Sequence, residues 1–114
     1  MSLNADGEVY IDVEDALKRI GGNMDLYKRL LGRFVEGNDM ATMEAAISSG
    51  NVEEAARLAH TIKGVSSNLS LVKVAAASID LEHSLKEGQD HTANYENLKQ
   101  AFNTTVAKIA EITG

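Results

Sequence analysis

Apolar side chains recur at helical spacing along most of the chain. The clearest case is the C-terminal segment from about residue 90, where apolar positions alternate steps of three and four: Tyr95, Leu98, Phe102, Thr105, Ile109 and Ile112. Similar patterns predict a short helix over residues 12–20 and long helices over residues 24–49, 52–68 and 71–87. No segment shows the two-residue alternation of a strand, so we expect no sheet.

Short clusters of glycine, serine, asparagine and aspartate separate these helices, at residues 21–23, 48–51, 68–70 and 87–90. Asp12 is the predicted cap of the first helix, and Gly21-Gly22 its end. Gly37-Asn38 is a weak point within residues 24–49, where we expect a kink or a break. Four long helices joined by short loops predict an all-α fold, an antiparallel four-helix bundle with a short extra N-terminal helix.

The 114 residues fit a single domain. Residues 1–10 are the expected N-terminal tail and residues 11–114 the expected bundle. Met1-Ser2-Leu3 is similar to an expression-vector leader, which suggests a domain cut from a longer protein.

Composition excludes several classes of function. The chain has no cysteine, which rules out disulfides, thiolate metal sites and cysteine nucleophiles. Aromatic residues make up 4% and the formal net charge is -6, so neither a nucleic acid nor an anionic membrane is an expected partner. No stretch is long and apolar enough to cross a membrane.

One histidine lies on the outer face of the predicted helix over residues 52–68. The apolar stripe of this helix is Ala55, Leu58, Ala59, Ile62, Val65 and Leu69. His60 projects opposite that stripe, with Arg57, Gly64 and Ser67 on the same outer strip and Lys63 beside it. Glycine within a helix costs about 1 kcal/mol relative to alanine. On an outer face, it is best explained by a partner that must approach closely.

A carboxylate falls within the apolar stripe of the next helix. Glu82 lies at about the level of His60 in the predicted hairpin of the two helices. A half-buried carboxylate requires a partner, and His60, Lys63 or Arg57 can serve, unless Glu82 reaches solvent. If Glu82 accepts the Nδ1 proton of His60, the free lone pair of Nε2 faces solvent as a nucleophile. With a cation nearby, this set suits phosphoryl transfer. It suits metal binding poorly, since no further ligand lies at ligand spacing.

The run Ala59-His60-Thr61-Ile62-Lys63-Gly64 resembles the signature of histidine-containing phosphotransfer (HPt) domains. The resemblance extends from about residue 11 to residue 88. It includes Gly22-Asn23-Met24-Asp25-Leu26-Tyr27 with Leu30-Leu31 and Phe34, then Asn68-Leu69 and Leu81-Glu82. The family commonly has glycine where this chain has Ser70, and Ser70 is a candidate cap for the following helix.

The resemblance implies a role for each matching residue. His60 would be the phosphoacceptor, Lys63 would attract phosphoryl oxygens, Gly64 would leave space for the partner, and Glu82 would bond the histidine ring. Arg57 and Ser67, on the same strip, are expected to contact the partner.

The partners that the resemblance implies are receiver domains of two-component phosphorelays. One receiver would supply the phosphoryl group, a second would take it, and the receiver would bring Mg²⁺, with no cofactor bound by this chain. No glycine-rich phosphate loop is present, so we expect no self-phosphorylation from ATP. A cytoplasmic location is implied, either free or tethered to the inner membrane through a parent hybrid sensor histidine kinase.

Two other interpretations stay open. The chain could be a helical adaptor that binds proteins through a groove, with His60 incidental, or the phosphoacceptor domain of a chemotaxis-type kinase. His83 and His91 are expected to be solvated surface residues.

Overall fold

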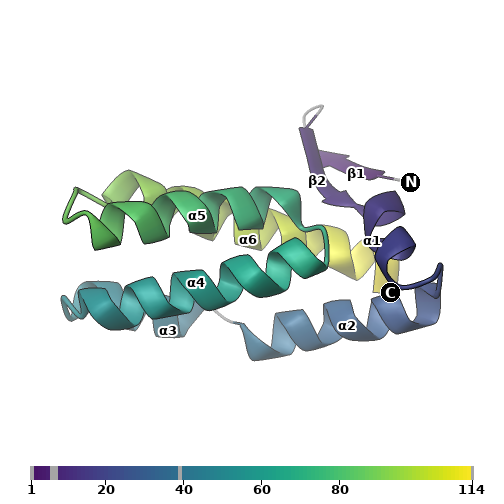
Figure 1. Ribbon diagram of the computed structural model, residues 1–114, viewed down its shortest axis with the longest axis horizontal. Coiled ribbons are helices and arrows are strands. Elements are labelled where there is room, and N and C mark those ends of the chain that lie inside the picture. Colours follow the sequence, from purple (N-terminus) through teal and green to yellow (C-terminus); the bar gives the residue numbers. More distant parts are fainter. Residues whose placement is uncertain (1, 6–7, 39, 114) are drawn as a thin grey trace.

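Helices form most of the structure, with one short β-hairpin at the N-terminal end (Figure 1). The computed structural model describes residues 2–5, 8–38 and 40–113. Within this part, the elements are β1 (Ser2–Ala5), β2 (Glu8–Asp12), α1 (Val13–Arg19), α2 (Met24–Gly37), α3 (Met40–Ser48), α4 (Val52–Asn68), α5 (Val72–Lys86) and α6 (Thr92–Thr113).

The long helices lie side by side as a bundle, which confirms the predicted helical class. Figure 1 shows α4 and α5 as an antiparallel hairpin with α6 packed on α5, while α2 and α3 follow one another along α4. The residues facing inward form one core, in which the Phe34 and Phe102 rings of α2 and α6 meet with centroids 5.6 Å apart. Five of the six seam positions predicted for α6 are buried, and Ile112 is partly buried.

The predicted break within residues 24–49 is present. α2 ends at Gly37 and α3 begins at Met40. Both the backbone N–H and the side-chain amide of Asn38 donate to the carbonyl of Phe34, each at 3.1 Å, so Asn38 closes the last turn of α2. The break lets α3 continue along α4 with a separate axis.

The N-terminal hairpin is where the structure differs from the expectation of no sheet. β1 and β2 pair antiparallel, with an irregularity in register between Leu3 and Asn4. Residues 9–11 of β2 are two β-branched residues and a tyrosine, types that favour strands. Ile11 is fully buried and Tyr10 packs partly against the core. The run is too short for its alternation to stand out in the sequence.

The turn between α4 and α5 is anchored by residues far away in the chain. The Tyr27 hydroxyl donates to the Leu69 carbonyl at 2.7 Å, and the Asp12 N–H donates to the Ser70 carbonyl at 3.0 Å. Burial raises the pKa of Tyr27 to about 12, so this donor keeps its proton. The hairpin that carries the site is therefore fixed from α2 and β2.

Ser70 does not cap α5, contrary to the expectation. Leu71 is the N-cap residue, without a side-chain hydrogen bond, and the Ser70 hydroxyl donates instead to Asp15 Oδ2 at 2.6 Å. The backbone of Ser70 has φ of +57°, the left-handed conformation that glycine adopts most readily. A turn of this shape accounts for a glycine preference at this position, and here the bond to Asp15 helps to hold a serine in it.

Candidate functional site

His60 projects from the outer face of α4 toward α5. Asn51 caps α4 by accepting the Glu54 N–H at 3.2 Å, and the helix buries Ala55, Ala59 and Ile62. These burials turn His60 outward, and 63% of its side chain is exposed. The predicted orientation of the histidine is therefore the observed one.

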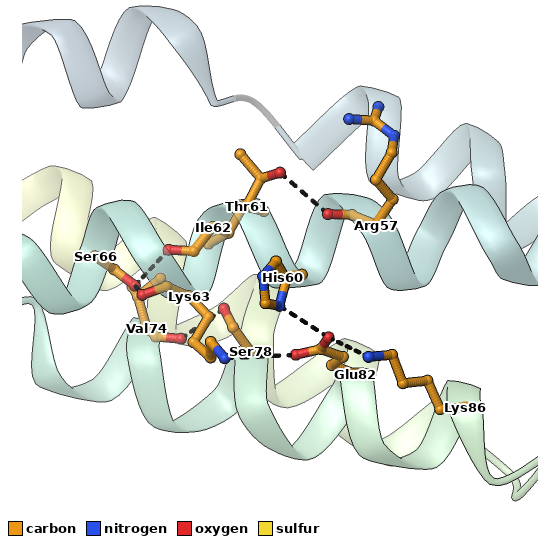
Figure 2. Close-up of polar contacts among 10 residues, drawn as sticks. All are labelled: Arg57, His60, Thr61, Ile62, Lys63, Ser66, Val74, Ser78, Glu82 and Lys86. Atoms are coloured by element: carbon orange, nitrogen blue, oxygen red, sulfur yellow. Dashed lines mark hydrogen bonds and ion pairs between the residues drawn. The ribbon is translucent and has the colours of Figure 1, made fainter.

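Glu82 lies on the inward face of α5, between the buried residues Leu81 and Leu85. Only 10% of its side chain is exposed, and its Oε2 atom lies 3.0 Å from Nδ1 of His60 (Figure 2). Of the partners that the sequence left open for Glu82, the structure brings His60 and Lys63 to it. Arg57 is directed away from it.

Two lysines surround the same carboxylate. Lys86 Nζ lies 2.9 Å from Oε2 of Glu82, and Lys63 Nζ lies 4.0 Å from Oε1. The hydrogen bond from Lys86 lowers the pKa of Glu82 most, and the charges of Lys86 and His60 add to this, against the opposing effect of burial. Glu82 is therefore an anion at neutral pH.

An ionised Glu82 fixes the tautomer of the neutral His60 ring. A carboxylate only accepts hydrogen bonds, so Nδ1 of the ring must be the donor at 3.0 Å. The proton of the neutral imidazole is then on Nδ1, and Nε2 carries a lone pair. Because the ring is exposed, this lone pair is accessible to a reacting group from outside the chain.

The other predicted site residues lie along α4. Arg57 is held by Glu54 one turn before it, with Nε 2.9 Å from Oε1, and this contact raises its pKa. Gly64 and Ser67 are both exposed. A Cβ placed at Gly64 would meet nothing within 4 Å outside its own helix backbone, so nothing within the described structure requires glycine there.

A groove of about 530 Å³ runs beside His60 between α4 and α5. Its apolar lining is Val52, Ala56 and Leu85, and its polar lining consists of Glu53, Arg57, His60, Thr61, Glu82 and Lys86. Ser67 is not among the lining residues. The histidine thus borders an open groove in which apolar side chains lie among charged ones.

Sequence reasoning missed Lys86. The signal is present, because a lysine four residues after a glutamate faces it on a helix. It is easily overlooked because Glu82 belongs to the buried face, whereas the long side chain of Lys86 reaches it from the exposed side. The expectation for His83 holds, since it is exposed, whereas His91 is half-buried.

The described residues contain no helix suited to crossing a bilayer, and no cluster of three potential metal ligands.

Comparison with known proteins places the chain in a family. The Hpt domain family matches residues 29–111. The crystal structure of histidine-containing phosphotransfer protein B (HptB) from Pseudomonas aeruginosa PAO1 is similar, with a TM-score of 0.80 and 25% identity over 90% of this chain and 92% of that one. No protein of curated function matches the sequence. The chain belongs to the Hpt domain family, and it is a histidine phosphotransfer module of phosphorelays.

Proposed function

We propose that His60 accepts a phosphoryl group from the aspartyl phosphate of one receiver domain and passes it to an aspartate of another. The observation that carries this proposal is the 3.0 Å contact between His60 Nδ1 and Glu82 Oε2 on an otherwise exposed ring. It leaves Nε2 as the nucleophile and holds the ring in one orientation. His60 also lies within the region that matches the family.

The step needs no group beyond these two proteins and the receiver's metal ion. The Nε2 lone pair attacks phosphorus, the Nε2–P bond forms, and the bond from phosphorus to the aspartyl oxygen breaks with its electrons leaving on the carboxylate. The proton on Nδ1 stays in place, and the positive charge that develops on the ring is stabilised by the Glu82 carboxylate, 3.0 Å away. Transfer to the second receiver is the reverse of this step.

Lys63 and Gly64 serve the incoming group and its carrier. Lys63 is half-buried next to Glu82, where its ammonium neutralises phosphoryl oxygens as they arrive. Gly64 lies one turn beyond His60, and the free space above it admits the surface of the receiver. Mg²⁺ comes with the receiver, and Arg57 and Ser67 contact that domain from the same face of α4.

The setting of this chemistry is part of the proposal. If α2 and α3 are taken as one interrupted helix, the helices form the antiparallel four-helix bundle expected of the family. The partners are receiver domains and a sensor histidine kinase, in the same polypeptide or separate, and the location is the cytoplasm.

Intact-mass spectrometry tests the role of His60. The chain is incubated with a phosphoramidate donor and, separately, with a phosphorylated receiver domain. We expect one acid-labile phosphoryl group in the wild type, and none in His60→Gln. His83→Gln is the matched control, because His83 is an exposed histidine on α5, and it should be phosphorylated like the wild type.

Two outcomes would contradict the proposal. If neither donor modifies the wild type, the alternative that the chain is a helical adaptor is favoured, with the groove between α4 and α5 as its binding surface. If His60→Gln is still phosphorylated, the acceptor is another residue.

A further inference from the structure

One oxygen of Glu82 serves two donors. Oε2 lies 3.0 Å from Nδ1 of His60 and 2.9 Å from Nζ of Lys86, while Lys63 is 4.0 Å from the other oxygen. Figure 2 shows Lys63 and Lys86 approaching the carboxylate from opposite sides, with the histidine ring between α4 and α5. The negative charge that faces the ring is therefore shared with a lysine that sequence reasoning did not single out.

Lys86 is placed to act on Glu82 without contributing to the core. It lies one helical turn after Glu82 on α5, and 62% of its side chain is exposed. Its ammonium reaches back over the edge of the groove that also borders His60. Substitution at such a position leaves the packing of the bundle intact.

We propose that Lys86 is a positioning residue. By binding Oε2 of Glu82, it weakens the electrostatic stabilisation that this carboxylate gives to the protonated form of His60. This inference rests on the proposed role of His60, because its benefit is to favour the neutral, nucleophilic form of the ring.

The physical reason is competition for one anion. When Lys86 is present, part of the field of Glu82 is cancelled at the ring, and a protonated His60 gains less from the pair. When Lys86 is removed, the whole carboxylate charge faces His60, so the imidazolium is stabilised and the ring stays protonated to higher pH. Fewer rings are then available to attack phosphorus at a given pH.

Other charged groups near the ring do not replace Lys86. On α4, Lys63 lies near Oε1 of Glu82, the oxygen that does not contact His60, and Arg57 is bound by Glu54. Glu53 of α4 also lines the groove. From α5, the charged lining residues are Glu82 and Lys86, and no residue of α3 or α6 lines the described groove. Lys86 is thus the cation in direct contact with the oxygen that faces His60.

The test is an NMR titration of the His60 ring in the unphosphorylated protein, with the signal assigned by its loss in His60→Gln. We expect Lys86→Met to move the midpoint upward by roughly 0.5 pH unit and Lys86→Arg to leave it near that of the wild type. In a Glu82→Gln background, the shift caused by Lys86→Met should shrink.

Lys99→Met is the matched control. Lys99 also lies near a glutamate, with Nζ 4.0 Å from Glu44 Oε1, but it belongs to α6 and does not line the groove. It removes the same charge and should leave the midpoint unchanged. A Lys86→Met midpoint that is unchanged, lowered or matched by Lys99→Met would overturn the inference.

Phosphorylation by phosphoramidate provides the functional half of the test. Lys86→Met should react more slowly than the wild type at pH 6.5, and the difference in rate should shrink as the pH is raised toward 8.5. Equal rates at pH 6.5 would overturn the inference. If no variant and no wild-type protein is phosphorylated at His60, the proposed function fails, while the titration still decides the role of Lys86.

Discussion

At the scale of single residues, the decisive feature is a carboxylate on the inner face of a helix. Helical periodicity placed Glu82 inside the stripe of α5 and His60 outside that of α4, and the structure has both there. Periodicity did not choose between the candidate partners of Glu82. That choice depends on how the two helices cross and on the side-chain rotamers. Arg57 is not a partner of Glu82 because it binds Glu54 within α4 instead.

The pairing of Glu82 makes a prediction for stability as a function of pH. Its folded pKa is lowered from the ordinary value of 4.5, mainly by the hydrogen bond from Lys86. The stabilisation that comes from its ionised form is therefore fully present above pH 4.5 and is lost as the pH falls through the folded pKa below that value.

Urea unfolding of the wild type and of Glu82→Gln at several pH values measures the contribution of ionised Glu82 to the free energy of unfolding. The wild type should be the more stable at pH 7, and the difference should shrink as the pH falls below 4.5. A difference that stays constant down to pH 3 would show that charge pairing of Glu82 does not contribute to stability.

At the scale of elements, the site depends on how α4 and α5 are joined and on the free space that α4 leaves beside Gly64. The bounds of both helices were predictable to within a residue or so, because short clusters rich in glycine, serine and asparagine mark their ends. The anchoring of their turn was not predictable. It uses Tyr27 and Asp12, which lie 42 and 58 residues away from the carbonyls they contact, and a local pattern carries no signal for contacts of that range.

Gly64 provides a prediction at this scale, with Gly32 of α2 as its control. Both glycines lie inside helices, and at either one an added Cβ would have no atom within 4 Å outside its own helix backbone. Alanine at either position should raise the free energy of unfolding, by up to about 1 kcal/mol, in a urea titration.

Only Gly64→Ala should impair transfer from a phosphorylated receiver, because only Gly64 adjoins His60. Both variants should still react with phosphoramidate, which is small enough to pass the added methyl group. Normal transfer from the receiver to Gly64→Ala would mean that the space above α4 is not part of the docking surface.

At the scale of the whole molecule, helical class and family could be recognised from the sequence, whereas the N-terminal hairpin could not. Long helices repeat their pattern many times, but β2 offers five residues. The hairpin is packed against the helices, since Ile11 is buried and the Asp12 N–H donates to the Ser70 carbonyl in the turn between α4 and α5. The N-terminal segment thus supports, from a distance, the hairpin of helices on which the site is built.

The central claim is that Glu82 holds Nδ1 of His60 and leaves Nε2 to carry the phosphoryl group. Two-dimensional ¹H–¹⁵N NMR of the phosphorylated protein distinguishes the two ring nitrogens directly. We predict a single phosphohistidine, at His60, with phosphorus bonded to Nε2. A phosphoryl group on Nδ1, or on any residue other than His60, would contradict the account.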